Sequence, residues 1–171
     1  MDPASFLQGR TRETTIRRDA LGRWFHDGEP LEHQNLTRAF DRWLDRAEDG
    51  RYCLKNDINW AYITLEGPPL FVRKAEVTSA GQVKLSLSDD SEPLLDPSTL
   101  REDADGALYC DVLRPNGPFV ARFERFAMQQ LEDALGEDAQ GVFLTVGGKK
   151  LRPPRVSDPL VPVLQSGSAK P

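Results

Sequence analysis

GRWFHDGEPL, residues 22–31, combines two turn signals with a short aromatic run and leads directly into an amphipathic segment. Glycines near both ends of the run permit the backbone angles of tight turns, so residues 23–26 are predicted to form a short strand between them. The run places a tryptophan and a histidine beside a helix start but completes no catalytic motif. It therefore indicates how the chain folds more than what it does.

Short strands and one helix are predicted for the first half of the chain. Residues 1–13 are polar and aperiodic and are interpreted as a flexible lead-in. Apolar residues recur at helical spacing from Leu36 to Ala47, with charged residues on the opposite face, and Asp49-Gly50 is predicted to end that helix. Strands are predicted at 14–18, 23–26, 51–54, 60–66, 70–77 and 83–88.

A second, similar unit is predicted after an acidic connection. Residues 89–106 contain Pro93 and Pro97 and are interpreted as the link between an N-terminal subdomain, 14–88, and a C-terminal subdomain, 107–152. The second subdomain is predicted to contain a hairpin of 107–113 with 118–123, a helix from Glu124 to Gly136, and a hairpin of 141–146 with 149–151. The proline-rich residues 153–171 are predicted to form an extended tail.

These elements predict an α+β fold made of two related small subdomains, each an antiparallel sheet with a helix. A gapped similarity between DGRYC at 49–53 and DGALYC at 105–110 is consistent with domain duplication, although a match this short is also expected by coincidence.

The charge of the chain argues against nonspecific nucleic-acid binding. The net charge is −5, whereas such binding needs a broad excess of Lys and Arg. The charge is uneven, with a net −8 over residues 81–140 and a net +4 over residues 141–171. A solvated acidic face followed by a basic tail is the simpler explanation, and a functional field is the alternative.

The cysteine content and hydropathy favour a cytoplasmic protein. Cys53 and Cys110 are too few and too far apart for a disulfide framework or a cysteine-rich zinc site. No window approaches the roughly 18 apolar residues that span a bilayer, and no secretory signal opens the sequence. Membrane insertion and secretion are therefore not expected.

The candidate catalytic groups form no recognisable site, and we predict no enzyme activity, no cofactor and no metal. His26 and His33 flank a turn, but one ends a strand and the other opens a helix, so convergence on a metal is not required. Each cysteine lies in a predicted strand beside a tyrosine, as a buried residue does. Gly147-Gly148 lacks the spacing of a phosphate-binding loop and fits a hairpin turn.

A binding surface is better supported than an active site. Aromatic rings with nearby guanidinium groups suit a nucleotide or a phosphorylated ligand, although the same aromatics also suit a core with solvated arginines around it. The residues concerned are Trp24, Trp43, Trp60, Tyr52, Tyr62, Tyr109, Arg23, Arg38, Arg51, Arg73, Arg122 and Arg125.

The order of motifs in the first half resembles the bacterial domain of unknown function 1285 family. The residues that carry the resemblance are 24–31, 36–44 and 49–54, and a looser match extends to 118–120 and 141–151. The resemblance implies two related α+β subdomains, the second loosely like a pleckstrin-homology barrel. It also implies a groove where they meet, a nucleotide-like ligand and a role in signalling.

The resemblance also suggests which residues bind that ligand. Where family members typically carry Thr-Pro-x-Glu this chain has Asn56, Asp57 and Asn59, and where they carry Thr-Asn it has Ser88-Asp89. Both positions stay polar. The predicted ligand-binding residues are Asn56, Asp57, Asn59, Ser88, Asp89, Trp24, His26 and Arg122.

The leading hypothesis is therefore a cytoplasmic ligand-binding or signalling module without chemistry. The alternative is a protein-interaction domain that docks a protein partner through the acidic connection or the proline-rich tail. A hydrolase that uses His26 is the third hypothesis.

Overall fold

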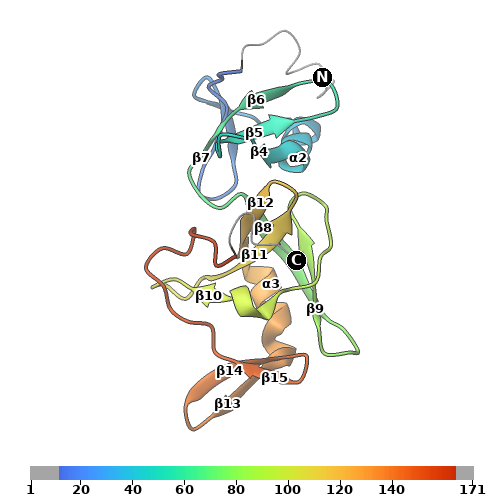
Figure 1. The fold of residues 1–171 in the computed structure, drawn as a ribbon, viewed down its shortest axis with the longest axis vertical. Helices are drawn as coiled ribbons and strands as arrows, with labels where there is room; N and C mark the ends of the chain where they lie inside the picture. The colour runs from blue at the N-terminus through green and yellow to red at the C-terminus, as the bar shows by residue number, and fades with distance from the viewer. Residues whose placement is uncertain (1–11, 165–171) are drawn as a thin grey trace. The chain divides into compact units, whose positions relative to one another are not determined.

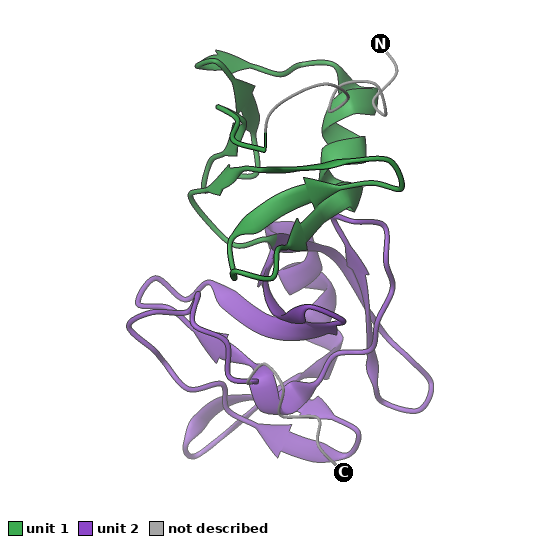
Figure 2. Cartoon of the chain, turned by 45° about the horizontal axis from the view of Figure 1, so that its top comes forward, with its two compact units in different colours: residues 1–69 green, residues 70–171 purple. Residues whose placement is uncertain are grey.

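The computed structural model describes residues 12–164, and the chain divides into two compact units (Figure 2). Unit 1 is Met1–Pro69 and unit 2 is Leu70–Pro171. Each unit is built from small sheets and short helices (Figure 1), so the predicted α+β class is confirmed. Among residues 12–164, no helix is both long enough and apolar enough to cross a membrane.

Unit 1 packs an amphipathic helix with small sheets. One sheet has the strand order β3-β2-β1-β7, and another has the order β4-β5-β6. The elements are β1 (Arg17–Arg18), β2 (Trp24–His26), β3 (Glu29–Pro30), α2 (Gln34–Trp43), β4 (Leu44–Arg46), β5 (Tyr52–Lys55), β6 (Trp60–Tyr62) and β7 (Thr64–Leu65).

The run at residues 22–31 forms the hairpin of β2 and β3. His26 pairs with Glu29, and the two residues between them, Asp27 and Gly28, both have positive φ angles, 52° and 81°. A tight hairpin turn of this kind requires positive φ at both central residues, which aspartate tolerates and glycine adopts freely. The strand predicted before this turn is therefore confirmed.

The helix α2 ends earlier than its apolar pattern predicts. The predicted helix extended to Asp49-Gly50, but Leu44 already begins β4 and pairs with Leu54 of β5. The apolar spacing does not distinguish a helix from a strand at Leu44, because its side chain would face the core in a helix and is buried in β4. Pairing with a strand that follows in the chain outweighs the local helical preference, as tertiary contacts often do.

The core of unit 1 forms where α2 covers the sheets. Its buried residues are Ile16, Trp24, Leu36, Phe40, Leu44, Leu54, Ala61 and Ile63. Trp24 and Phe40 meet edge to face, with ring centroids 5.3 Å apart. Full burial of each large apolar side chain contributes about 1.5–3 kcal/mol.

Unit 2 is organised around the sheet with the order β10-β11-β12-β8-β9, and a further sheet has the order β13-β14-β15. The elements are β8 (Leu70–Val77), β9 (Val83–Leu87), η1 (Pro97–Thr99), β10 (Arg101–Glu102), β11 (Leu108–Arg114), β12 (Gly117–Phe123), α3 (Arg125–Gln130), η2 (Leu131–Ala134), β13 (Leu135–Asp138), β14 (Gly141–Val146) and β15 (Lys149–Leu151).

The boundary between the units lies earlier than the acidic connection predicts. The sequence predicts residues 70–88 in the N-terminal subdomain, but β8 pairs in parallel with β12, where Leu70 faces Ala121. The connection, residues 89–106, contains η1 and β10 and lies inside unit 2. A parallel pairing between distant strands leaves no local signal, which explains the difference.

Local turn chemistry predicted the hairpins of unit 2 correctly. Pro115 and Asn116 join β11 to β12, one position earlier than the Asn-Gly pair predicts, and Gly117 already begins β12 with a φ of 111°. Gly147-Gly148 joins β14 to β15. The helix predicted from Glu124 to Gly136 is shorter, because α3 passes into the 3₁₀ turn η2 and then into β13.

The two DG motifs occupy equivalent hairpin turns, one in each unit. The Gly50 amide donates to the Ala47 carbonyl at 2.9 Å, and the Gly106 amide donates to the Asp103 carbonyl at 3.1 Å. Both glycines adopt positive φ, 87° and 82°. The common geometry agrees with duplication, which stays a prediction because this turn is frequent in hairpins generally.

A buried arginine and aspartate join several segments of unit 1. Arg18 is 1% exposed, and its Nη1 donates to Asp41 Oδ1 at 3.1 Å, while its Nη2 donates to the carbonyls of Pro68 and Pro69. Trp24 Nε1 donates to the same aspartate oxygen at 2.9 Å. The Asp41 carboxylate therefore has two donors, and the charge of Arg18 is compensated inside the unit.

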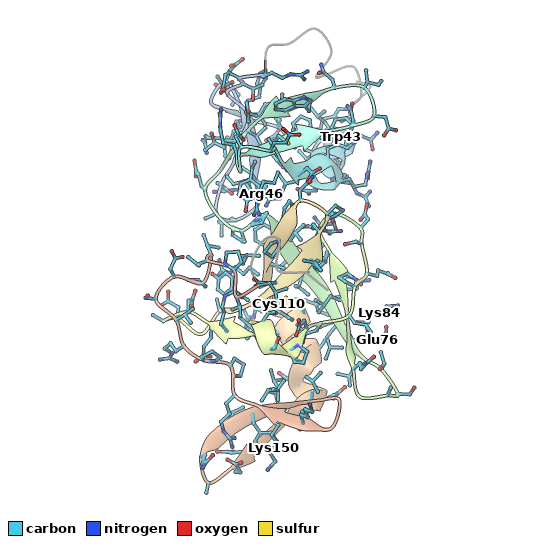
Figure 3. The ribbon with its side chains drawn as sticks, viewed as in Figure 1. Trp43, Arg46, Glu76, Lys84, Cys110 and Lys150 are labelled. Carbon is cyan, nitrogen blue, oxygen red and sulfur yellow. The ribbon has the colours of Figure 1, made fainter. Side chains whose placement is uncertain are left out.

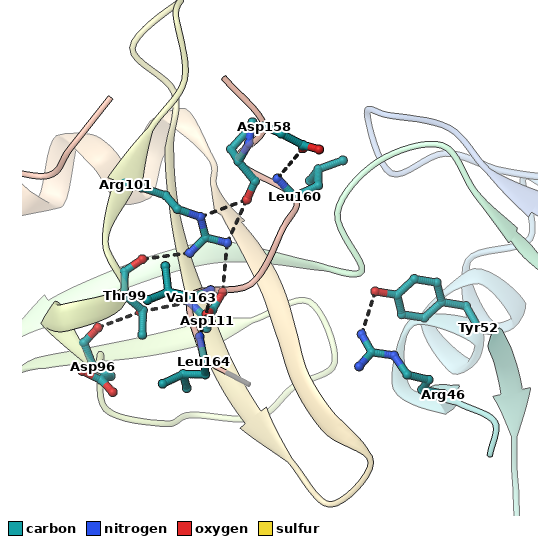
Figure 4. A network of polar contacts seen from close by, with 11 residues as sticks. Arg46, Tyr52, Asp96, Thr99, Arg101, Asp111, Asp158, Leu160, Val163 and Leu164 are labelled. Atoms are coloured by element: carbon teal, nitrogen blue, oxygen red, sulfur yellow. Dashed lines mark hydrogen bonds and ion pairs between the residues drawn. The ribbon is translucent and has the colours of Figure 1, made fainter. Parts of the chain in front are cut away.

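Unit 2 contains a second buried pair, which holds the segment after β15 (Figure 4). Arg101 Nη2 donates to Asp111 Oδ1 at 2.9 Å, and the guanidinium also donates to the carbonyls of Thr99 and Pro159. The amides of residues 163 and 164 donate to Asp111 Oδ2 at 2.6 and 2.8 Å. We call residues 153–164 the strap.

The strap is the first part of the predicted extended tail, and the structure anchors it to unit 2. Its backbone completes the hydrogen bonds of two buried charges, so its position is specified by main-chain atoms. Its apolar side chains point outward, with Leu160 41% exposed and Val161 60% exposed. The rest of that predicted tail, residues 165–171, and most of the predicted lead-in lie outside the described residues.

Candidate ligand-binding site

Three predicted site residues of the first half, Asn56, Asp57 and Asn59, lie together in the turn between β5 and β6. Asn56 Oδ1 accepts from the amides of Ile58 and Asn59, both at 2.8 Å. Asn59 Oδ1 accepts from Arg12 and from the Trp60 amide, while Asp57 is exposed. The two asparagine oxygens thus fix the turn, as Asx side chains commonly do.

Trp24 and His26, also predicted to bind the ligand, lie on β2. Trp24 is 2% exposed and belongs to the core of unit 1. His26 Nε2 lies 3.5 Å from Asp27 Oδ2. Among the residues that the structure describes, no group of three or more His, Cys, Asp and Glu side chains is placed to hold a metal ion.

The predicted residues of unit 2 lie at two places on its main sheet. Ser88 is buried and its Oγ accepts from the Phe71 amide at 3.0 Å. Asp89 bonds Ser91 and forms an ion pair with Arg114. A shallow polar depression of about 380 Å³ lies beside them, lined by Arg73, Lys74, Ser86, Leu87, Asp90, Ser91 and Glu92.

Arg122, the last predicted site residue, lies on β12. Its guanidinium carbon is 5.9 Å from the ring centroid of Tyr109, and Tyr109 itself donates to Asp103 Oδ2 at 3.2 Å. The structure therefore places Arg122 beside a structural tyrosine, and on the sheet it pairs with Phe71 of β8, whose backbone bonds Ser88.

Guanidinium groups lie over aromatic rings that are candidates for stacking on a ligand. Arg12 lies 4.4 Å from the ring centroid of Trp60, and Arg51 lies 3.6 Å from that of Tyr62. Arg51 is held there by a two-pronged ion pair with Glu13, at 2.8 and 2.9 Å. A base that stacked on the same face of either ring would have to displace the protein's own cation.

An apolar pocket of about 290 Å³ lies within unit 2, among β10, β11, α3, η2, β13 and β14. Its walls are mostly leucine, valine, methionine and phenylalanine side chains. The residues that line it are Glu102, Gly106, Leu108, Met128, Leu131, Leu135, Val142, Phe143, Leu144, Arg152 and Pro153. Apolar walls with a few polar groups are typical of small-molecule sites, and the volume is near the lower end of their usual range, about 300 Å³.

Both charged residues of the pocket have partners. Arg155 donates to Glu102 Oε1 through Nε at 3.2 Å and Nη2 at 3.1 Å. Arg152 pairs with Asp138 Oδ2, and the hydrogen bond from Arg152 holds the pKa of the Asp138 carboxyl below its usual value. Lys150, labelled on β15 in Figure 3, lies 3.6 Å from the same oxygen.

Solved structures with this arrangement of elements identify the fold. A DUF1285 family protein from Silicibacter pomeroyi DSS-3 superposes with a TM-score of 0.61 and 17% identity, over 90% of this chain and 82% of that one. The chain has the DUF1285 fold. A DUF1285 family protein from Shewanella baltica OS155 agrees, with a TM-score of 0.51 and 18% identity, over 66% of this chain and 85% of that one. No protein-family model and no curated protein matches the sequence.

The resemblance predicted from the sequence motifs is thus confirmed as a likeness of fold. The pleckstrin-homology detail of the DUF1285 expectation stays a prediction. Sequence reasoning missed the apolar pocket of this DUF1285 fold because its walls come from distant elements. The sequence signal was the apolar residues Leu135 and Val142, which lie in the hairpin of β13 and β14, and the structure leaves them 45% and 60% exposed.

The cysteines of this DUF1285 fold are expected to be inert in the native state. Burial raises the pKa of the Cys53 thiol to about 11 and that of Cys110 (Figure 3) to about 12. At pH 8 a rise of two pKa units lowers the thiolate fraction about 100-fold. We expect Ellman's reagent to titrate both thiols in guanidinium chloride but neither in buffer, and fast native labelling of either would contradict the burial.

We expect the same thiols to lower the free energy of unfolding at high pH. Their pKa values are raised in the folded state, so above the unfolded value of 9.0 the unfolded chain loses protons that the folded chain keeps. The free energy of unfolding is therefore expected to fall as the pH rises from 9 toward 12. The double variant Cys53→Ala, Cys110→Ala should show a smaller fall in chemical denaturation over this range.

The absence of a side chain at Gly136 leaves room for the ring of Phe143, which lines the pocket. A Cβ built at Gly136 would lie 2.6 Å from Cζ of Phe143, which faces it across β13 and β14. Gly136→Ala is expected to displace the ring and lower stability by about 1 kcal/mol. Thermal unfolding measures the loss, which should disappear when Gly136→Ala is made in a Phe143→Leu background. Equal losses in both backgrounds would show that the ring is not responsible.

Proposed function

We propose that the protein is a ligand-binding module that holds a small molecule in the apolar pocket of unit 2 and performs no chemistry on it. The observation that carries the proposal is the pocket itself, about 290 Å³ with largely apolar walls and charged groups at Glu102 and Arg152. Each methylene that a ligand buries there contributes about 0.8 kcal/mol. A compact ring system would fill such a volume.

Binding without chemistry is supported by the groups that line the pocket. Of the described residues in its walls, none is a serine, cysteine, histidine or lysine. These side chains are common nucleophiles in covalent catalysis, and a carboxylate is another. Glu102, the carboxylate of the pocket, is held in an ion pair with Arg155.

A nucleotide-like ligand and a signalling role are the finer part of the proposal. The apolar walls suit the face of a base, and a guanidinium at Arg152 suits a phosphate. The polar residues at the strand ends, Asn56 and Asp89 among them, support this ligand less, because each already bonds within the protein. We place the module in the cytoplasm because both cysteines are unpaired.

A thermal-shift screen tests the proposal. Nucleosides, nucleotides, cyclic dinucleotides and aromatic carboxylates are compared, since a ligand at 100 times its Kd stabilises the folded state by about 2.7 kcal/mol. Val142→Trp should fill the pocket and abolish the shift. Val161→Trp is the matched control, because both valines are 60% exposed and only Val142 lines the pocket. Equal shifts in the two variants, or no shift with any compound, would contradict the proposal.

Protein interaction is the second candidate function, and the strap is the observation that favours it over the acidic connection. Its backbone is anchored at Asp111, while Leu160, Val161 and Val163 are 41%, 60% and 51% exposed. Apolar side chains presented on an extended backbone are a common means of peptide recognition. Deleting the strap would also unpair buried charges, so point variants are the better test.

The double variant Leu160→Ser, Val163→Ser separates the two functions. If it loses partner capture while Val142→Trp keeps it, the strap is the docking surface. If partner capture survives the double variant, the strap plays no such role.

A further inference from the structure

An excess of positive charge gathers beside the apolar pocket. Lys150 Nζ and Arg152 Nη2 both contact the same atom, Oδ2 of Asp138. Both cations also lie over the ring of Phe143, at 4.4 and 5.4 Å from its centroid. Two cations thus share one carboxylate oxygen, and the group carries a net positive charge.

Arg152 presents this charge to the pocket. It lines the pocket, and its side chain is 35% exposed. Within residues 12–164, Asp138 is the hydrogen-bond acceptor that it meets. A guanidinium has five N–H donors, so donors are left over for a second anion.

The carboxylate of the pocket does not cancel that charge. Glu102 Oε1 accepts two hydrogen bonds from Arg155, which is the two-pronged geometry that neutralises a carboxylate well. A ligand in the pocket therefore meets apolar walls, a compensated carboxylate and a cation with donors to spare.

Resting on the proposed function, we infer that the ligand is an apolar molecule with one anionic group, which pairs with Arg152. A neutral ligand would leave the donors of Arg152 facing apolar atoms, and a cation would meet the excess positive charge. An apolar carboxylate fits both the walls and the charge. A nucleoside monophosphate is the other source of the same chemistry.

Matched acid and amide probes test the charge of the ligand. We would titrate 2-naphthoate and 2-naphthamide into the full chain by calorimetry, with adenosine 5′-monophosphate and adenosine as a second pair. The charged member of a pair is expected to bind at least about ten-fold more tightly than the neutral one. Whichever pair binds identifies the source of the anion.

Variants assign the preference to Arg152. Arg152→Gln is expected to reduce the ratio of acid to amide affinity to near one, and Arg152→Lys to retain part of it. Lys84→Gln is the charge-matched control, because Lys84 lies on β9 and pairs with Glu92 outside the pocket (Figure 3). Arg155→Gln should weaken the acid more than the amide, since it exposes the charge of Glu102.

The outcomes distinguish the inference from the proposed function. If acid and amide bind the wild-type protein equally, or if Arg152→Gln keeps the preference, the inference is wrong while the pocket is still a binding site. If no probe binds and the wider screen finds no ligand, the proposed function fails as well. A preference that disappears equally in Lys84→Gln would show a general field effect and overturn the role of Arg152.

Discussion

Replacing Asp111 with alanine is expected to lower the free energy of unfolding of unit 2 by about 3–5 kcal/mol. Arg101 is 2% exposed and would keep its charge with no carboxylate beside it. The amides of residues 163 and 164 would also lose their acceptor, so the strap would be released at one end. Few single substitutions elsewhere in the unit remove this many interactions of buried polar groups.

Hydrogen exchange is the measurement that resolves this effect. Peptides from β11 and β12 report unit 2, and peptides from β5 report unit 1 as an internal reference. Asp105→Ala is the control, because Asp105 is exposed in the turn before β11 and should change stability by no more than about 0.5 kcal/mol. Exchange in β11 that is the same in both variants would show that the buried pair contributes little.

A double variant tests whether the loss comes from the missing ion pair or from a buried charge that is left without a partner. Arg101→Met combined with Asp111→Leu removes both charges, and apolar replacements of a buried pair are often close to neutral. We therefore expect a smaller loss than for Asp111→Ala alone, with the remainder due to the strap amides. A larger loss would mean that the ion pair itself stabilises the unit.

Asp41→Ala is expected to have a similar effect in unit 1, again about 3–5 kcal/mol. Arg18 is 1% exposed and would face an apolar methyl group, and the indole Nε1 of Trp24 would lose its acceptor. The carbonyls of Pro68 and Pro69 would still accept from Arg18 but cannot neutralise it.

Tryptophan fluorescence is the appropriate probe, because Trp24, Trp43 and Trp60 are the tryptophans of the chain and all lie in unit 1. The midpoint of urea unfolding should fall for Asp41→Ala and stay in place for Asp57→Ala, which changes an exposed turn residue. Coincident midpoints for the two variants would refute the prediction.

Local signals predicted most of the hairpins, and for a physical reason. Asp27-Gly28 and Gly147-Gly148 have positive φ at both turn positions, which few other residue pairs adopt, so sequence alone specifies these two turns. The end of α2 was harder, because Leu44 is buried whether the backbone is helical or extended. The unit boundary could not be predicted, since β8 and β12 are separated by 39 residues and pair in parallel.

The candidate site shows a different limit. Asparagine, serine and aspartate at strand ends are typical of binding sites and of turns, because the same oxygen atoms accept hydrogen bonds from a ligand or from nearby amides. In the structure Asn56 and Ser88 bond the backbone. The apolar pocket was missed because Leu108, Met128 and Val142 are ordinary core-type residues until the fold brings them together.

The strap has a consequence for the order in which the chain becomes stable during synthesis. The described elements of unit 1 all precede residue 70, so they can assemble while later residues are still being added. In unit 2, Asp111 is synthesised 53 residues before Leu164, whose backbone amide donates to its Oδ2. At a translation rate of about 5–20 residues per second, roughly 3–10 s pass before the last backbone partners of Arg101 and Asp111 have been synthesised. Unit 2 of a nascent chain is therefore most exposed to aggregation and chaperone binding just before the strap emerges from the ribosome.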